Sequence, residues 1–178
     1  MIIKGLKGLF GFLTILPIGM ESMEALSKYF FLAPIVGLLL GAIAGGFGYL
    51  ANMFLPRLVC GFLVLVVLEL LTGFHHMDGL LDFSDAAMAR GDTKKRLEIM
   101  HDMFTGAAAV TSGVIVVVLA GLSFGSFSGL NILKVAIVAE TLAKESMVLM
   151  AYLGKKPDYK GSGYYLSLIH ISEPTRPY

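Results

Sequence analysis

Long apolar runs without a charged residue dominate the pattern of this 178-residue chain. No charge occurs between Tyr29 and Pro56, and none occurs between Met103 and Leu133. A helix needs roughly 20 apolar residues to cross a bilayer, and both runs exceed that length. The pattern therefore predicts an all-α, polytopic membrane helix bundle, with spans at about 30–54 and 105–126.

Two further segments are apolar but carry charges. Residues 58–73 predict a second span with Glu69 near its end, and residues 132–153 predict a fourth. At this depth an acid is expected to face protein or water rather than lipid. In the fourth span Glu140 and Lys144 lie four residues apart, so they are expected to pair inside the bundle. Whether Lys144 instead reaches a substrate phosphate stays open.

Small residues indicate where helices approach and where they end. Gly37, Gly41 and Gly45 recur every four residues, which predicts a ridge against which another helix packs closely. The Gly- and Ser-rich stretch 121–129 predicts the turn after the third span. The basic N-terminal segment around 6–16 is short, and we expect it to lie along the membrane interface.

Composition supports membrane residence and excludes other classes. Apolar residues make up 56% of the chain and charged residues only 15%, which is unusual for a soluble domain. The net charge is +1, and no basic stripe with interleaved aromatic residues occurs, so no nucleic-acid partner is expected. The single cysteine, Cys60, cannot form an internal disulfide and is expected to be buried.

Lys and Arg fall unevenly on the two sides of the predicted spans. One side has only Arg57 and Lys134. The other side has Lys4, Lys7, Lys28, Arg90, Lys94, Lys95, Arg96, Lys155, Lys156 and Lys160. The positive-inside rule then predicts a multi-pass protein of the cell membrane, with the segment between spans 2 and 3 facing the cytoplasm.

That segment, 75–102, concentrates acids and histidines in an otherwise apolar chain. Its acids include Asp78, Asp82, Asp85, Glu98 and Asp102, and its histidines are His75, His76 and His101. On a helix, His75 and the first three aspartates share one face, and Glu98 and Asp102 share another. Like charges stacked in this way repel unless a divalent cation lies among them, so the pattern indicates Mg²⁺-dependent phosphoryl chemistry.

A break at 91–93 divides this segment, and Asp92 or Thr93 is expected to cap the second piece. Two helical pieces joined by a turn would let their acidic faces converge. A solvated polar loop is the alternative explanation, although the acids keep a helical period and alternate with apolar residues. No zinc-hydrolase spacing occurs among the histidines. His76 is a candidate base, and Gly79 would let a phosphate approach the backbone.

The pattern His76-x-Asp78-Gly79-x-x-Asp82-x-x-Asp85, followed by Leu97-Glu98-Ile99-Met100-x-Asp102 and Gly106, resembles the adenosylcobinamide-GDP ribazoletransferase (cobalamin synthase) family. The resemblance extends upstream through 12–17 and 34–41, and it reaches to about Tyr165. One departure is that Phe74 stands where the family has a second glycine after Gly73.

The resemblance implies a membrane transferase that joins α-ribazole, or its 5′-phosphate, to adenosylcobinamide-GDP and releases GMP. It implies that Asp78, Asp82 and Asp85 bind Mg²⁺. It also implies that Glu98 and Asp102 complete the metal site or orient the nucleophile, and that Arg96 and Lys144 offset phosphate charge. With the candidates named above, the expected catalytic residues are His76, Asp82, Glu98 and Asp102, and the expected phosphate-binding residues are Gly79, Arg96 and Lys144. The expected partners are these two small molecules and the lipid bilayer, and self-association is left open.

Family members continue through further spans, so the chain looks truncated at its C-terminus. We expect one integral membrane domain over 1–165 and a non-native tail over 166–178, whose sequence is typical of a translated sequencing adapter. Two alternative functions stay open. One is an enzyme similar to the CDP-alcohol phosphotransferases, and the other is a cation transporter with Glu69, Asp78 and Asp82 along its ion path.

Overall fold

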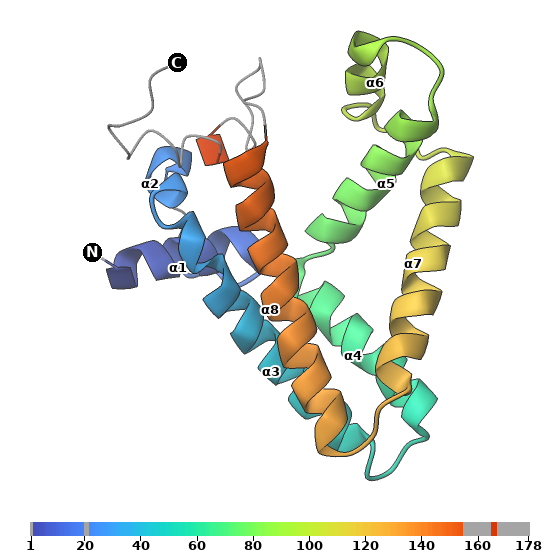
Figure 1. Ribbon diagram of the computed structural model, residues 1–178. Coiled ribbons are helices and arrows are strands. Elements are labelled where there is room, and N and C mark those ends of the chain that lie inside the picture. Colours follow the sequence, from blue (N-terminus) through green and yellow to red (C-terminus); the bar gives the residue numbers. More distant parts are fainter. Residues whose placement is uncertain (1, 20–21, 155–164, 167–178) are drawn as a thin grey trace. The chain divides into compact units, whose positions relative to one another are not determined.

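The computed structural model describes residues 2–19, 22–154 and 165–166, and over these ranges the protein is helical, with no strand. Figure 1 shows the helices in chain order. They are α1 (Ile2–Leu13), α2 (Met23–Ser27), the short 3₁₀ helix η1 (Phe30–Leu32), α3 (Ala33–Ala51), α4 (Arg57–Thr72), α5 (His75–Met88), α6 (Thr93–Ile99), α7 (Ala107–Gly125) and α8 (Leu130–Leu153). The predicted all-α class is confirmed.

Two helical segments are long and apolar enough to cross a membrane by themselves. They are Phe30–Ala51, which joins η1 to α3, and α7, and they correspond to the predicted spans at 30–54 and 105–126. Helices α4 and α5 are long and apolar enough to cross a membrane only when taken together, and the bend between them is 94°. The protein is therefore a multi-pass membrane protein. Helices also occur at 58–73 and 132–153 as predicted, and their passage through the bilayer stays a prediction.

The described residues fall into two compact units. The first combines the chain up to Gly45 with the part from Leu133 onward, and the second is Gly46–Ile132. The predicted single domain over 1–165 stays a prediction. The predicted tail over 166–178 lies, apart from Leu166, outside the described residues.

In the first unit, α3 and α8 pack through the predicted glycine ridge. A Cβ atom at Gly41 would lie 2.5 Å from the carbonyl oxygen of Ala136, and one at Gly45 would lie 2.8 Å from the Cβ of Ala136. At Gly37 a Cβ would collide with the Glu140 carbonyl. The ridge is confirmed, because only the missing side chains let the two backbones approach this closely.

In the second unit, α4 and α7 approach each other in the same way. A Cβ at Gly61 would meet the backbone at Gly121 and Gly125, and one at Gly125 would lie 2.8 Å from the Cα of Leu58. The predicted turn over 121–129 is therefore wrong in its first half. Gly121 lies inside α7, where it packs against α4, and the turn follows at 126–129, with Gly129 at a φ of 55°.

The bend between α4 and α5 rests on two consecutive residues in the left-handed conformation. Gly73 has a φ of 64° and Phe74 a φ of 60°. A residue with a side chain is strained there by about 1–2 kcal/mol, which gives a physical reason for the glycine that the family pattern has at position 74. The ring Nδ1 of His75 lies 2.9 Å from the Gly73 carbonyl oxygen and closes the bend.

We predict that Gly41→Ala lowers the stability of the full-length protein by about 1–3 kcal/mol, because the new methyl group overpacks against the α8 backbone. Gly46→Ala is the matched control on the same helix. It has no atom within 4 Å of its Cβ position and is expected to raise stability by about 0.5–1 kcal/mol. Thermal unfolding in detergent measures both, and equal effects would contradict the prediction.

Candidate functional site

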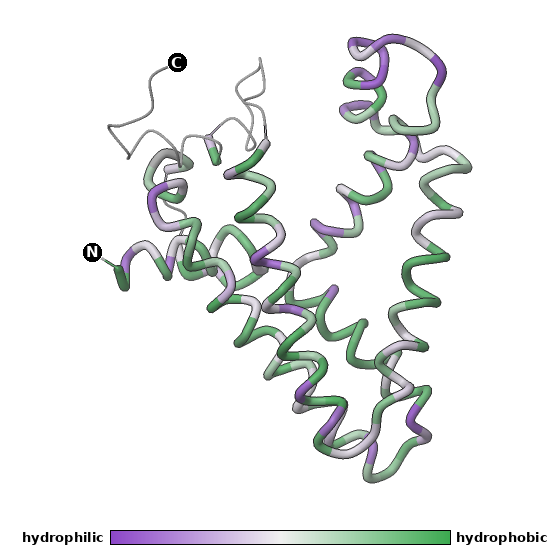
Figure 2. Tube along the Cα trace, in the orientation of Figure 1, coloured by the Kyte–Doolittle hydropathy of each residue, from purple (hydrophilic) through white to green (hydrophobic). Residues whose placement is uncertain are grey.

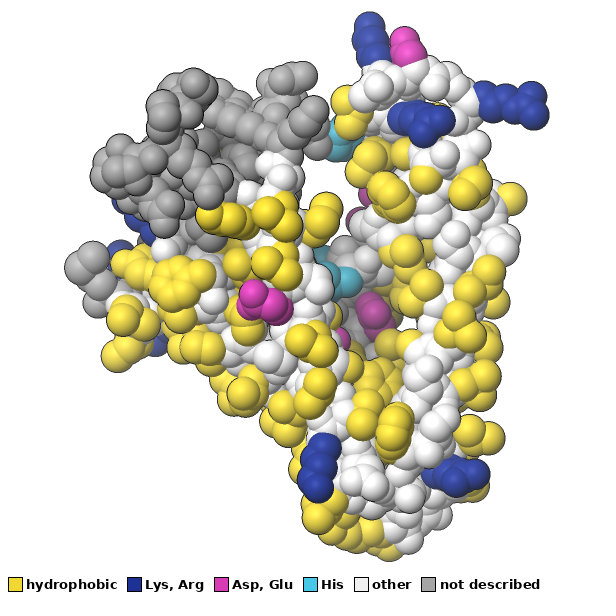
Figure 3. Space-filling view, in the orientation of Figure 1, with side chains coloured by type: hydrophobic (Ala, Val, Ile, Leu, Met, Phe, Trp, Pro, Cys, Tyr) yellow, Lys and Arg dark blue, Asp and Glu magenta, His cyan; other side chains and the backbone are white. Residues whose placement is uncertain are grey.

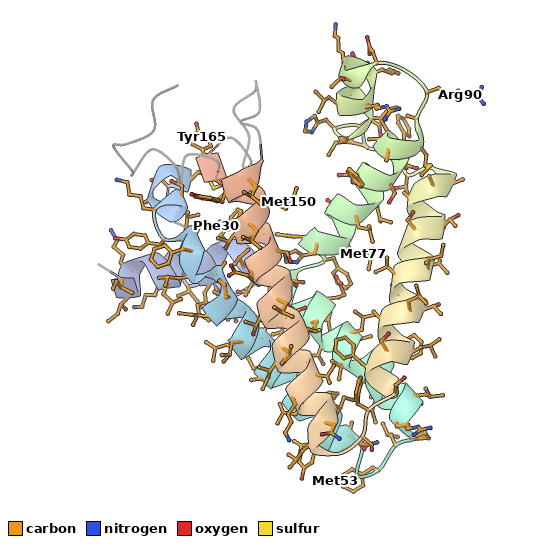
Figure 4. All side chains as sticks on the ribbon, viewed as in Figure 1. Phe30, Met53, Met77, Arg90, Met150 and Tyr165 are labelled. Carbon is orange, nitrogen blue, oxygen red and sulfur yellow. The ribbon has the colours of Figure 1, made fainter. Side chains whose placement is uncertain are left out.

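Helix α5 presents two neighbouring rows of side chains. Met77, Leu81 and Asp85 follow one another at intervals of four residues and face α7, because a Cβ at Gly113 would lie 2.9 Å from Leu81 Cδ2 and 3.9 Å from Met77 Sδ. Figure 4 marks Met77 on α5. Asp78 and Asp82 form the adjacent row of acids, so the packing of α5 on α7 decides where these acids point.

Asp85 connects α5 to the first turn of α7. Its Oδ2 accepts a hydrogen bond from the Gly106 N–H at 2.5 Å, and its Oδ1 accepts one from the Ala109 N–H at 2.9 Å. These amides belong to the group that a helix start leaves without intrahelical partners. The N-cap residue of α7, Gly106, has no side chain with which to cap the helix itself.

Asp82 is half-buried on the acidic row, and several charged side chains influence it. Its pKa is raised above the ordinary value of 3.8, first by burial and then by the nearby charges of Asp78, Asp102 and Asp85. His101 acts in the opposite direction and lowers the pKa. The charges of Asp102 and His101, which follow α6, therefore act on Asp82 of α5. A catalytic role of Asp102 stays a prediction.

The predicted geometry of Glu98 and Asp102 is wrong. Helix α6 ends at Ile99, so Asp102 lies beyond it in a turn, where its Oδ1 accepts a hydrogen bond from the Phe104 N–H at 2.9 Å. The two acids therefore do not share a helical face. The predicted break and cap are confirmed, because the Asp92 carboxylate accepts the Lys95 N–H at the start of α6.

Glu98 and Arg96 lie on the exposed surface of α6. Glu98 pairs with Lys95 at 3.4 Å, and both side chains are more than half exposed, at 55% and 59%. Figure 3 shows Lys and Arg side chains gathered around α6. This basic surface is made by Arg90, Lys94, Lys95 and Arg96.

His76 and Gly79 lie near the beginning of α5. His76 is half-buried, and Gly79 is exposed, with open space where a Cβ would be. The Gly79 N–H belongs to the helical ladder, so the open space beside Gly79, and not a free amide, is what this position offers a phosphate.

In the first unit, Lys144 is 97% buried and donates a hydrogen bond to Glu140 Oε2 at 3.2 Å. The predicted pairing of these two residues is confirmed. A phosphate contact by Lys144 stays a prediction.

A family model described as cobalamin-5-phosphate synthase (CobS) matches residues 5–175 of this chain. The chain belongs to this family. The match includes the whole acidic segment, and it continues into the stretch predicted as a non-native tail.

Curated relatives carry the name adenosylcobinamide-GDP ribazoletransferase. One from Methanococcoides burtonii is 35% identical over 170 residues, which are 89% of this chain and 62% of the relative. Others come from Methanosarcina mazei, at 32% identity over 84% of this chain and 58% of the relative, and from Saccharolobus islandicus, at 33% over 86% and 65%. The chain thus spans about three fifths of the length of these relatives. No solved structure matches.

The acids of this CobS-family chain suit Mg²⁺ by their chemistry. Among the described residues, no three His, Cys, Asp or Glu side chains lie close enough together to hold a metal by themselves. Mg²⁺ commonly binds through one or two carboxylates, with waters and substrate phosphates as its other ligands, and the neighbouring Asp78 and Asp82 offer such a pair. Asp85 differs from them, since both of its oxygens already accept amide hydrogens.

Sequence reasoning missed the contact between Asp85 and Gly106, although both residues stand in the quoted motif. A Cβ at Gly106 would lie 2.8 Å from Asp85 Oδ1, so glycine is required there by close approach. The available signal was a long apolar helix that begins directly after a glycine, with no capping side chain at its N-cap position.

We predict that Asp82→Asn stabilises the full-length protein at pH 7 in the absence of divalent cations. The pKa of Asp82 in the folded protein lies above its ordinary value of 3.8. Protonated Asp82 therefore stabilises the folded state below pH 3.8, and this stabilisation is lost as the pH rises through the raised pKa. Removing the charge should therefore raise stability at pH 7 by up to about 1 kcal/mol, and this gain should vanish near pH 3.5.

Thermal unfolding at both pH values measures the effect. Asp92→Asn is the control, because asparagine also caps α6 and the substitution should change stability little at either pH. A wild-type protein more stable than Asp82→Asn at pH 7 would contradict the prediction.

Proposed function

We propose that the full-length protein is a Mg²⁺-dependent membrane transferase that joins α-ribazole, or its 5′-phosphate, to adenosylcobinamide-GDP and releases GMP. Family membership and the names of the relatives support the reaction class. The observation that carries the proposal is the row of carboxylates on α5, in which Asp78 lies one turn before Asp82. The negative charges of Asp78 and Asp102 raise the pKa of Asp82, and such repulsion favours a bound cation.

In the proposed reaction, a ribose hydroxyl oxygen of α-ribazole, or of α-ribazole 5′-phosphate, attacks the phosphorus next to cobinamide. A new P–O bond forms, and the bond from that phosphorus to the bridging oxygen breaks, so that GMP leaves with the bonding electrons. The proton of that hydroxyl passes to a base, and half-buried His76 at the start of α5 is our candidate.

Asp78 and Asp82 would hold the ion, which would offset the negative charge on the diphosphate. Asp102 lies near enough to influence Asp82, so it would orient water or nucleophile at the same place. Arg96, on the exposed surface of α6, would attract the phosphate groups. Glu98 has a weaker claim to a catalytic role, because it pairs with Lys95 on the solvent side of α6.

The basic surface around α6 supports a cytoplasmic location for the site, in the cell membrane. In the second unit, α7 separates four Lys and Arg residues near α6 from Arg57 at the start of α4. Figure 4 marks Arg90 beyond the end of α5. Under the positive-inside rule, the α6 end would face the cytoplasm, where nucleotides and Mg²⁺ are available.

For the activity, we predict that the full-length protein in membranes releases GMP from adenosylcobinamide-GDP only when α-ribazole or its phosphate and Mg²⁺ are present. Asp82→Asn should lower kcat by at least about 100-fold, because an interaction worth several kcal/mol with the bound ion is lost. Quantification of GMP and of the corrinoid product measures this.

Asp92→Asn is the matched control, since Asp92 caps α6 and asparagine caps equally well. Near-normal turnover by Asp82→Asn would overturn the assignment of the site. Release of CMP from a CDP-alcohol, or cation uptake that is lost in Glu69→Gln, would support the alternative functions instead.

For the orientation, we predict that a cysteine at position 94 reacts with a membrane-impermeant maleimide only in inside-out vesicles. A cysteine in place of Arg57 should react only in right-side-out vesicles. The native Cys60 is fully buried, so it contributes little background. Labelling of both positions from the same side would refute the proposed topology.

A further inference from the structure

The third aspartate of the motif differs from the other two in what its oxygen atoms contact. Asp78 is exposed, whereas both oxygens of Asp85 accept amide hydrogens from the start of α7, whose N-cap Gly106 lies 21 residues later in the chain. The carboxylate lies at the positive end of the α7 dipole, where a negative charge is stabilised. These contacts satisfy the needs of a helix start without any metal.

The rows on α5 lead to the same distinction. Asp85 continues the row of Met77 and Leu81, which packs against α7 at Gly113. Asp78 and Asp82 belong to the neighbouring row. A residue one turn after Leu81 on the packing row faces α7, so Asp85 is placed to join two helices.

Gly106 provides an independent sign that the contact is specific. It lies at the N-cap with a φ of −90° and a ψ of −180°, a conformation open to any residue, so its backbone does not require glycine. A Cβ there would nevertheless lie 2.8 Å from Oδ1 and 3.0 Å from Oδ2 of Asp85. The position has room for the carboxylate or for a side chain, and not for both.

We propose that Asp85 is a positioning residue that caps α7 from α5, and that it thereby fixes the direction of the Asp78 and Asp82 row instead of binding the metal ion. Loss of the cap would free the end of α5 from α7. The acids would then lose their register with Asp102, which follows α6 and precedes α7 directly in the chain.

The first test needs neither metal nor substrate. In the full-length protein without Mg²⁺, Asp85→Ala should speed hydrogen exchange of the amides at 106–109 by about fivefold, the factor that corresponds to the loss of a helix cap. Asp85→Asn keeps one acceptor oxygen but turns its NH2 group toward the other amide, so its exchange should lie between that of the wild type and that of Asp85→Ala. Asp92→Ala, which removes the cap of α6, should speed exchange at Lys95 and leave 106–109 unchanged.

Gly106→Ala keeps the aspartate but displaces it, so it should reproduce the faster exchange of Asp85→Ala. The double variant should exchange no faster than either single variant, because both changes remove the same contact. Unchanged exchange in Asp85→Ala, or additive effects in the double variant, would overturn the proposal.

The second test rests on the proposed function and separates positioning from metal binding. Asp85→Asn should leave the Mg²⁺ concentration for half-maximal GMP release within about twofold of the wild type, whereas Asp85→Ala should lower kcat at that same concentration. A rise of about tenfold or more in the required Mg²⁺ for Asp85→Asn would identify Asp85 as a metal ligand and overturn the proposal. If the wild-type protein releases no GMP, the proposed function fails, and the exchange result still decides the role of Asp85.

Discussion

The second unit depends on one constraint: the start of α7 has no capping side chain of its own, and its first amides need acceptors. Asp85 supplies them from α5. Ala109 is buried, and an unsatisfied amide is unfavourable where water is scarce, so the two hydrogen bonds hold α5 against α7 more specifically than apolar contacts alone would. The direction of the neighbouring acids follows from this contact, because Asp78 and Asp82 lie on the adjacent row of the same helix.

Close backbone packing supports this arrangement. Lipid offers no hydrophobic driving force between helices, so they associate through van der Waals contact where side chains are absent. Gly41 and Gly45 allow the close contact of α3 with α8 in the first unit. Gly61 and Gly121 allow the close contact of α4 with α7 in the second. Large apolar side chains of α7, such as Val114, Ile115 and Leu119, are accordingly exposed. Figure 2 shows that hydrophobic residues make up most of this helix.

The acidic side chains on α5 repel one another. Asp82 is partly removed from water and lies near Asp78 and Asp102, and the raised pKa expresses how poorly the charged form is accommodated. Strain of this kind is common where a protein has to bind a cation or a phosphate, since the ligand relieves it. The left-handed Phe74 adds local backbone strain at the bend that leads into the same helix.

The sequence by itself predicted the long apolar helices, the glycine ridge of α3 and a helix cap at Asp92 or Thr93, and it singled out a group of acids, because each of these depends on composition or on spacing within one segment. The tertiary structure decided what those acids do. The charge of Asp102 acts on Asp82 although Asp102 lies beyond the end of α6. Glu98, from the same motif, pairs with Lys95 instead. Asp85 has the same helical spacing as a metal ligand would have, yet it caps a distant helix. Spacing along a helix specifies a face, and only the packing of a second helix specifies which atoms that face meets.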